Sequence, residues 1–342
     1  MAMKILSVSI PCYNSASYME TCIKSLLPAG EDIEILIIDD GSTKDNTLEI
    51  AQRYEKQYPG IVRAIHQENA GHGGAVNTGI SEATGIFFKN IDSDDWADTD
   101  VLLKIIGILK DFESKGTKID LFLANYIFDR EDSNKKKVMR FKGAFPKGRP
   151  FTWDEVGHMG QSQFIMMHTI IYRRDVLLKS GTLLPKHAYY VDNIYAFQPL
   201  PYVKTIYYLD EALYHYRIGR SDQSVNVEIQ LKNIDQQIMV DMRITDLYVN
   251  RPKNLSPRLE KYLIAFLKLM YCATSAILLV GGTPEHLSKK EVLWNYLKDS
   301  DPVAYKKIRK SFMGGWMNIP GALGRKISVL GYKISQKIFA FN

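Results

Sequence analysis

The sequence predicts an α/β fold with a mostly parallel central sheet flanked by helices. Short apolar and β-branched runs alternate with helical patterns four times within the first 112 residues, and a polar loop follows each run. At 342 residues the chain is long enough for a catalytic domain with an additional segment. Its 46% hydrophobic and 24% charged residues are typical of a soluble globular protein.

The expected elements follow in order along the chain. A first strand at 5–10 stops at Pro11 and precedes a helix at 17–27. Further strands are expected at 33–38, 61–65 and 86–88, with helices at 45–58, between 74 and 85, and at 101–112. The next segments are strands at 121–128 and 164–172, an exposed hairpin or loop at 129–137, and irregular chain at 141–160. From about residue 225 the pattern is helical, and its apolar part at 262–279 is too short for a membrane span.

Cysteine usage and the first strand favour a cytoplasmic protein. Cys12, Cys22 and Cys272 are odd in number and lack metal-ligand spacing, which is typical of a reducing compartment. The apolar run at 5–10 is too short for the hydrophobic region of a signal sequence. The glycines at 71–74 argue against a nicotinamide-binding domain, because a G-x-G-x-x-G register that begins at Gly71 ends on a valine.

Clustered carboxylates follow the strand at 86–88. Asp92, Asp94 and Asp95 come directly after this run, where a strand of an open α/β sheet delivers its loop to the ligand crevice. Hard oxygen ligands at such a position suit Mg²⁺ or Mn²⁺. The alternative is an acidic N-cap for a helix that begins near Thr99.

Three loops at the same edge of the sheet together suggest a site for a nucleoside diphosphate. Tyr13 beside Pro11 offers an aromatic face for a base, and a carboxylate of the Asp39–Asp40 pair can accept the imide N–H of that base. Asp39 itself is expected to be a turn residue that binds its own backbone. A metal ion on Asp94 could neutralise the diphosphate.

The ordered motifs resemble glycosyltransferase family 2, whose members have the GT-A fold. These motifs are Pro-Cys-Tyr-Asn from residue 11, Ile-Asp-Asp-Gly-Ser-Thr-Lys-Asp from 38, Asn-Ala-Gly from 69 followed by Asn-Thr-Gly from 77, and Asp-Ser-Asp-Asp-Trp from 92. The similarity extends over roughly residues 5–225. It implies that Asp40 holds uracil with Pro11 and Tyr13 near the base, that Asp92 faces the ribose, and that Asp94 binds Mn²⁺ or Mg²⁺.

The resemblance also implies a general base and a lid. Asp192 matches the catalytic aspartate, although Val191 replaces the glutamate that usually precedes it. Asn77 matches a nucleotide-sugar-binding position, but the arginine that often precedes it in the family is absent here. Arg217 and Arg220, together with His215 and Ser221, fall in the segment that resembles the lid. The two arginines are expected to bind phosphate or to form surface ion pairs, and His215 to be a hydrogen-bonded residue or a third metal ligand.

The resemblance predicts an inverting, metal-dependent glycosyltransferase. It would move a hexose or N-acetylhexosamine from a UDP-sugar to a hydroxyl of a glycan or lipid-linked acceptor, with residues 1–225 as the catalytic domain and 226–300 as a helical extension. A sugar-1-phosphate nucleotidyltransferase is the first alternative, but the loop at 11–14 lacks the glycine-rich, basic phosphate loop that such an enzyme needs. A non-catalytic subunit that binds a nucleotide sugar is the second. The sequence leaves the oligomeric state open.

The last segment, 301–342, predicts a membrane-associating tail. It carries a net charge of +7, which leaves the first 300 residues at −1. Apolar residues at 327, 330, 334, 338 and 341 form one helical stripe, and lysines at 326, 333 and 337 lie along its edge. Such a helix is suited to the anionic inner face of the cell membrane. Packing on the protein and nucleic-acid binding are the alternatives, and the apolar stripe argues against nucleic acid.

Overall fold

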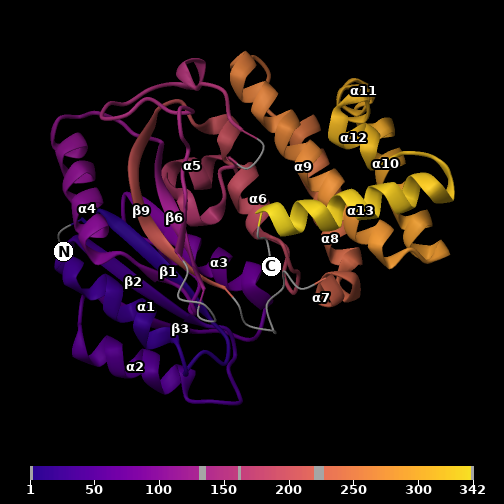
Figure 1. Cartoon of the computed structure of the whole chain (residues 1–342). Helices are drawn as coiled ribbons and strands as arrows, with labels where there is room; N and C mark the ends of the chain where they lie inside the picture. Colours follow the sequence, from indigo (N-terminus) through magenta and orange to yellow (C-terminus); the bar gives the residue numbers. More distant parts are fainter. Residues whose placement is uncertain (1–2, 131–135, 161–162, 219–226, 340–342) are drawn as a thin grey trace. The chain divides into compact units, whose positions relative to one another are not determined.

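The chain forms two compact units, residues 1–218 (unit 1) and 219–342 (unit 2) (Figure 1). The computed structural model describes residues 3–130, 136–160, 163–218 and 227–339, with side chains as far as residue 332. Unit 1 contains the sheet, and unit 2 is helical in its described part. Each unit has its own core.

The first half of the sheet in unit 1 is parallel, as the sequence predicts. Its strands are β1 (Leu6–Cys12), β2 (Ile33–Asp39), β3 (Val62–His66) and β4 (Phe87–Asn90), in the order β3-β2-β1-β4. The helices that alternate with them are α1 (Met19–Leu26), α2 (Thr47–Gln57), α3 (Gly71–Glu82) and α4 (Thr99–Ser114). Because β2 and β3 lie on one side of β1 and β4 lies on the other, the loops after β1 and β4 diverge. Such a switch point is where open α/β sheets bind ligands.

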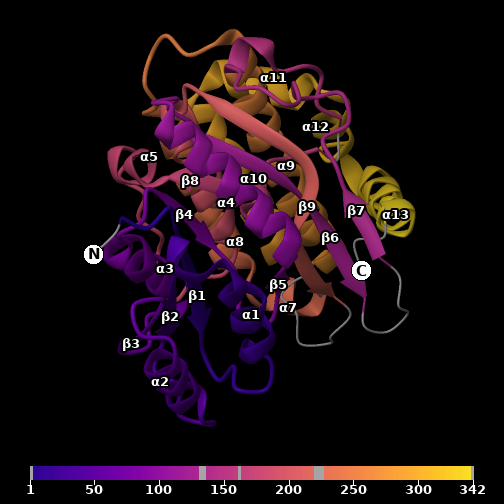
Figure 2. The same ribbon diagram turned by 90° about the vertical axis from the view of Figure 1, so that its left-hand side faces the viewer.

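The second half of the sheet is mixed. It contains β5 (Trp96–Ala97), β6 (Leu121–Arg130), β7 (Lys136–Met139), β8 (Ile170–Arg173) and β9 (Ile206–Ile218). Strand β8 is antiparallel to both β4 and β6, while β6 and β9 run parallel side by side (Figure 2). The short helices are α5 (Arg174–Lys179) and α6 (Asp192–Phe197), and 3₁₀ turns occur at Leu27–Asp32, Trp153–Glu155, Met167–Thr169 and Leu200–Tyr202. This arrangement confirms the α/β class, with a mixed rather than wholly parallel sheet.

Two local expectations were wrong, and one strand was missed. Strand β1 continues through Pro11, because β4 pairs only with Leu6–Ser9 and the missing N–H of the proline lies beyond that ladder. The expected strand at 164–172 is shorter, since Met167–Thr169 forms a 3₁₀ turn ahead of β8. The missed strand is the 13-residue β9, whose aromatic-rich sequence favours a strand; His215 and Arg217, which resemble lid residues, lie on it.

Unit 2 consists of helices arranged around one apolar helix. They are α7 (Val227–Lys232), α8 (Ile234–Val249), α9 (Pro257–Gly281), α10 (Pro284–Ser300), α11 (Pro302–Lys310), α12 (Phe312–Trp316) and α13 (Gly321–Phe339). Each of the others contacts α9. Helix α9 has the length and apolarity of a membrane span, but 67% of its most apolar window is buried inside the protein. The expectation that this stretch is too short for a span is wrong, because the helix extends beyond 262–279 at both ends. Its burial is that of a core helix, which agrees with the packed helix expected there.

Candidate active site

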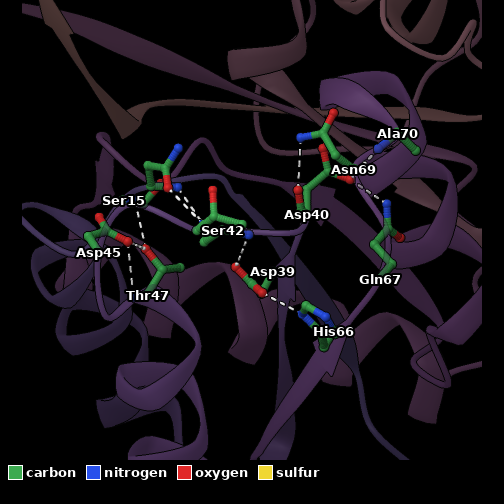
Figure 3. A network of polar contacts seen from close by, with 12 residues as sticks. Ser15, Asp39, Asp40, Ser42, Asp45, Thr47, His66, Gln67, Asn69 and Ala70 are labelled. Carbon is green, nitrogen blue, oxygen red and sulfur yellow. Dashed lines mark hydrogen bonds and ion pairs between the residues drawn. The ribbon is translucent and has the colours of Figure 1, made fainter.

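Asp40, directly after β2, is held with one carboxylate oxygen available. It is buried, and its Oδ1 accepts hydrogen bonds from Gln67 Nε2 at 2.6 Å and from the backbone N–H of Ala70 at 2.8 Å (Figure 3). Its Oδ2 accepts none from the described residues. The carboxylate is therefore fixed in orientation while one oxygen can still accept a hydrogen bond from a ligand.

Gln67 is a positioning residue that sequence reasoning missed. The hydroxyl of Thr78 on α3 donates to Gln67 Oε1 at 2.5 Å, which fixes the amide so that its N–H₂ faces Asp40. Gln67 directly follows β3, whose carboxyl end lies at the same edge as that of β2. An amide immediately after a parallel strand was therefore a usable signal.

Asp39 has the structural role expected of it. Its carboxylate accepts from the backbone N–H of Ser42, at 3.3 Å, and lies 2.6 Å from Nδ1 of His66 (Figure 3). The side chain is fully buried. It stabilises the turn after β2 and ties that turn to the end of β3, which leaves Asp40 as the carboxylate that faces the ligand side.

The loop after β1 presents an aromatic ring beside this carboxylate turn. Tyr13 is 49% exposed, whereas Pro11 is buried within β1. Asn14 has φ 51°, a left-handed conformation that asparagine tolerates, and its Oδ1 accepts from the backbone N–H groups of Thr43 and Lys44. The loops after β1 and β2 are thus joined, and the exposed ring belongs to the same edge as Asp40.

Asp92 lies in a hydrogen-bonded cluster with His72, which sequence reasoning missed. His72, on the first turn of α3, places Nε2 3.0 Å from Asp92 Oδ1. Burial alone would lower the pKa of His72, but the hydrogen bond and the charges of Asp92, Asp192 and Asp94 outweigh burial and raise it. Burial alone would likewise raise the pKa of Asp92, yet the bond from His72 lowers it. The only sequence signal was a histidine among the glycines that follow β3.

Asp192, the predicted base, is brought to this cluster from a distant part of the sequence. It is the first residue of α6, and its carboxylate interacts electrostatically with both His72 and Asp92. Burial raises the pKa of Asp192; His72 opposes this shift and Asp92 adds to it. Tyr190, two residues earlier, has φ 64°, an uncommon conformation for a tyrosine. Such backbone strain is frequent where a functional side chain must be aimed.

The glycines at the start of α3 allow the segment before Asp192 to pack closely. A Cβ on Gly73 would lie 2.3 Å from the carbonyl oxygen of Pro185, and a Cβ on Gly71 would lie 2.8 Å from the backbone nitrogen of His187. The side-chain amide of Asn77 exchanges two hydrogen bonds of 2.9 Å with the backbone of Leu184. Asn77 therefore holds this segment, and its direct contact with a nucleotide sugar stays a prediction.

The second half of the sheet supplies the partners of Asp95. The carboxylate of this buried residue accepts from the Tyr214 hydroxyl at 2.5 Å and from the backbone N–H of Arg217 at 2.8 Å, both on β9. Burial and the charges of Asp94 and Asp92 raise its pKa. Asp98, not this cluster, caps α4 by accepting from the backbone N–H of Val101. The N-cap alternative therefore does not account for the carboxylates at 92–95.

Asp92, Asp95 and His168 offer ligand atoms that all lie within 4.8 Å of one another. His168 comes from the 3₁₀ turn before β8, and burial lowers its pKa to about 4, which favours the neutral, ligating form. The fully buried Lys89 donates to the carbonyl oxygens of His168 and Ile170, at 3.0 and 3.2 Å, and so fixes this turn. No local motif surrounds His168, so the sequence offered no signal for it. Asp94 is half-buried in the same turn as Asp92.

The described residues of the expected lid lie on β9, beside Trp96. The His215 ring stacks on Trp96 with centroids 5.1 Å apart, and its Nδ1 lies 3.2 Å from Asp129 Oδ2. His215 is therefore a hydrogen-bonded histidine, the first of its two expected roles. The guanidinium of Arg217 lies 5.3 Å from the centre of the Trp96 ring. Arg220 and Ser221 lie outside the described residues.

The fold and the site define an α/β protein with an acidic ligand site at the switch point of its sheet. Residues 7–177 match the model of the family described as "Glycosyl transferase family 2". The chain is 30% identical over 250 residues to the uncharacterized glycosyltransferase alr2836 of Nostoc sp., which covers 72% of this chain and 74% of that protein. This chain belongs to glycosyl transferase family 2.

Other relatives match over shorter stretches. EpsH of Bacillus subtilis (strain 168), named as a glycosyltransferase, is 30% identical over 234 residues. The alignment covers 63% of this chain and 61% of EpsH, so the chain matches about three-fifths of that relative's length. A chondroitin synthase of Escherichia coli is 39% identical over 99 residues, which is 29% of this chain and 14% of that enzyme.

Solved structures support the GT-A fold. TarS 1–349 of S. aureus has a TM-score of 0.68 at 18% identity, over 98% of this chain and 91% of that one. TarS 1–349 in complex with UDP-GlcNAc gives the same score at 17% identity and the same coverage. The mannosyltransferase PcManGT of Pyrobaculum calidifontis, in complex with GDP-Man and Mn²⁺, has a TM-score of 0.52 at 14% identity, over 97% and 89% of the two chains. At these identities the likeness establishes the fold.

Proposed function

We propose that this protein is a metal-dependent inverting glycosyltransferase. It moves a hexose or N-acetylhexosamine from a UDP-sugar to a hydroxyl of an acceptor, a lipid-linked oligosaccharide in the synthesis of a cell-surface polysaccharide. Family membership supports the reaction class. The observation that carries the proposal is the convergence of Asp92, from the loop after β4, and Asp192, from α6, on the single side chain of His72.

Asp40 is proposed to select the base. Its one uncommitted oxygen, fixed by Gln67 and Ala70, suits the imide N–H of uracil, and the exposed ring of Tyr13 can stack on a pyrimidine. Pro11 is buried beneath that loop and sets its direction from β1. The UDP and UDP-GlcNAc complexes of TarS support a UDP-sugar donor.

The carboxylates after β4 fit a divalent cation. Two carboxylates and one imidazole within 4.8 Å of each other are donors that Mn²⁺ accepts, and carboxylates alone suit Mg²⁺. We propose that Asp94, which is half-buried in the same turn as this cluster, holds the ion, while Asp92 is directed to the ribose and His168 and Asp95 lie beside the ion. When bound, the ion would neutralise charge on the diphosphate leaving group.

Asp192 is proposed to take the proton from the acceptor hydroxyl. The raised pKa makes its carboxylate a stronger base than an exposed aspartate. The α3 glycines and Asn77 hold the segment that carries it, so that the base keeps its place relative to Asp92. Arg217 and Arg220 are proposed to balance the charge of the departing diphosphate.

We further propose that the protein lies on the inner face of the cell membrane as a peripheral protein, with its C-terminal segment 301–342 as the attachment. The positive charge of this segment supports that placement. A lipid-linked acceptor is concentrated at such a surface, so an enzyme held there meets it more often.

A donor screen tests the reaction class. Purified protein is incubated with Mn²⁺ and a panel of UDP-, GDP- and dTDP-sugars, and the free nucleotide is measured with and without EDTA. Release from one UDP-sugar that EDTA abolishes is the expected result. Release from a GDP-sugar alone, or release that is unaffected by EDTA, would contradict the proposal.

Asp192→Asn separates an enzyme from a binding subunit. We expect turnover to fall by about 10²–10⁴-fold, because general-base assistance is lost, while UDP affinity remains. Asp175→Asn, at an exposed site on α5, is the matched control and should keep full turnover. Unchanged turnover in Asp192→Asn would remove the assigned base.

A further inference from the structure

The C-terminal helices of unit 2 carry positive charge that the protein does not neutralise. Residues 302–332 contain six lysines and arginines and no acidic residue. Arg309 is half-buried and donates to the carbonyl oxygen of Asn318. The other five are exposed: Lys306, Lys307, Lys310, Arg325 and Lys326. Among the described residues none of the five has an ion-pair partner, so their charge is available to an external anionic surface.

Helix α13 presents large apolar side chains to solvent along one face. Leu323, Ile327 and Leu330 are 73%, 39% and 60% exposed, and their spacing of four and three residues places them on one side of the helix. Lys326 lies along the edge of this face. A soluble helix normally buries such a face, so the exposure calls for a partner.

The same helix packs on its own unit through small residues. A Cβ on Gly324 would lie 2.5 Å from the Ile319 side chain, and a Cβ on Gly331 would lie 2.8 Å from the Trp316 ring. The hydroxyl of Ser328 donates to the Trp316 carbonyl oxygen at 2.7 Å. Close packing of these three small residues fixes the rotation of α13, and the fixed rotation turns the leucine and isoleucine face outward.

Helix α11 and the start of α12 also expose apolar side chains, and on α11 these lie beside lysines. Val303 is 62% exposed and shares one face of α11 with Lys306, Lys307 and Lys310, while Ala304 on the other side is buried. Two residues beyond α11, Phe312 is 78% exposed.

Phe312 is joined to α13 by direct contacts. Its ring packs on Trp316 with centroids 5.7 Å apart, and the Trp316 indole lies against Gly331, next to the exposed Leu330. The exposed apolar residues of α12 and α13 are therefore parts of one region.

We propose that the exposed faces of α11 and α13, together with Phe312, bind the headgroup and upper acyl region of a bilayer rich in anionic lipid. We name this region the lipid-facing surface. The proposal deepens the peripheral placement given above and rests on it. The apolar side chains Leu323, Ile327, Leu330 and Phe312 enter the acyl boundary, and the lysines of α11 contact the phosphates above it. Nucleic acid would use the lysines and leave Leu323 and Leu330 without a role.

Vesicle co-sedimentation of the full chain tests this surface. Vesicles of phosphatidylcholine mixed with phosphatidylglycerol should retain the wild-type protein, and vesicles of phosphatidylcholine alone should retain much less. The double variant Leu323→Glu/Leu330→Glu should lose at least about tenfold in partitioning, since two inserted side chains become charged. Lys306→Glu/Lys307→Glu should lose a similar factor, and the wild-type partitioning should fall as salt rises.

The matched control is Leu178→Glu/Leu183→Glu, which changes two leucines of unit 1 that are 51% and 64% exposed. It should partition like the wild type. Phe312→Trp gives a second readout, because brominated acyl chains should quench the added fluorescence only on the anionic vesicles.

Two results would overturn the inference. One is equal partitioning of wild type and the Leu323/Leu330 variant. The other is a shift of that variant from dimer to monomer in sedimentation velocity with vesicle binding unchanged, which would assign the surface to a second copy of the chain. Nucleotide release from the UDP-sugar without vesicles is measured in parallel, so that a failed lipid surface and a failed transferase assignment give different outcomes.

Discussion

Buried carboxylates differ between the two units in how many hydrogen bonds they accept. In unit 1 each buried carboxylate accepts at least two hydrogen bonds, at Glu34, Asp39, Asp40, Asp95 and Asp120. In unit 2 the buried Asp241, on α8, accepts one on its side chain, from the Thr274 hydroxyl at 2.6 Å. Its Oδ1 has no hydrogen-bond partner among the described residues.

The difference follows from the backbone that surrounds each group. Strand ends and turns have N–H groups that no ladder uses, and in unit 1 the carboxylates of Asp40, Asp95 and Asp120 accept from such groups. The interior of a helix has no unused N–H, so a carboxylate there depends on side chains alone. Burial accordingly raises the pKa of Asp241 to about 8, and the bond from Thr274 only partly opposes this shift. A strand end therefore offers a buried carboxylate backbone hydrogen-bond donors that the interior of a helix does not.

Asp241→Asn should produce the largest change in the free energy of unfolding. The folded pKa of Asp241 lies above its ordinary value of 3.8, so the folded state binds the extra proton and its stability falls as the pH rises from about 4 to about 8. The slope for one such group is up to about 1.4 kcal/mol per pH unit. The asparagine variant should lose this slope and be more stable than the wild type at pH 8, by several kcal/mol. Hydrogen exchange of the α8 and α9 amides at pH 5, 6.5 and 8 measures it.

The intrinsic rate of amide exchange also changes with pH. The protection of wild type and of Asp241→Asn is therefore compared at the same pH, where the intrinsic rate affects both proteins equally. Thr274→Val is a second variant. It removes the hydroxyl that donates to Asp241, and it should steepen the loss of protection at high pH. Parallel slopes for wild type and Asp241→Asn would mean that Asp241 is already solvated in the native state.

Asp120→Ala should change the stability in the opposite direction and destabilise the protein. The carboxylate of Asp120 accepts from the backbone N–H groups of Lys204 and Thr205, at 2.8 and 3.1 Å, at the start of β9. Removing it leaves two donors unpaired and should destabilise β9 by about 2–4 kcal/mol, measured as lost exchange protection in β6 and β9. Asp32→Ala is the control: among the described residues the Asp32 side chain pairs only with the exposed Lys110, so the variant should cost less than about 1 kcal/mol. Equal losses in both variants would contradict the comparison.

Tyr214→Phe tests one donor at the site itself. It deletes the hydroxyl that donates to Asp95 and accepts from the backbone N–H of Asp92 at 3.3 Å, but keeps the bond from the Arg217 backbone, so the expected destabilisation is about 1–2 kcal/mol. Thermal unfolding followed by circular dichroism can detect such a change. Tyr58→Phe, which removes a hydroxyl from a 37% exposed tyrosine, is the control and should not alter the melting temperature. A Tyr214→Phe melting temperature equal to that of the wild type would show that one donor suffices for Asp95.

The sequence predicted the parallel half of unit 1 because its signals are local. Each strand, loop and helix of that half lies within a few tens of residues, and Asp40, Asp92 and Asp94 lie in the short motifs that follow the strands. The mixed half of the sheet depends on contacts between distant segments, such as β9 with β6 and β4 with β8. An aromatic-rich stretch at 206–218 could have been read as a strand, but nothing local fixes its partner.

The same limit applies to the site residues that sequence reasoning missed. His168 comes to Asp92 and Asp95 from more than 70 residues away, and only the pairing of β8 with β4 brings it there. His72 was visible as a lone histidine among glycines, yet its contact with Asp92 depends on the orientation of α3. Asn77 was expected at the nucleotide sugar, and its hydrogen bonds to Leu184 appear only once the segment before α6 is placed.

Gln67→Ala should have the smallest effect, and it tests whether donors from the protein matter for ligand binding. Without the Gln67 amide, the Asp40 carboxylate keeps, of its partners in the described part of the chain, only the Ala70 backbone N–H, and it can rotate. Its second oxygen is then less well placed for a base N–H. We expect UDP affinity to fall by up to about tenfold, or about 1.4 kcal/mol, in isothermal titration calorimetry. The UDP affinity of Gln67→Glu should be lower still, because this variant places a second carboxylate beside Asp40. Gln52→Ala, at an exposed position of α2, should bind UDP like the wild type. If Gln67→Ala and Gln67→Glu both bind UDP as tightly as the wild type, the fixed carboxylate of Asp40 is not what the base recognises, and the role of strand-end donors would be limited to stability.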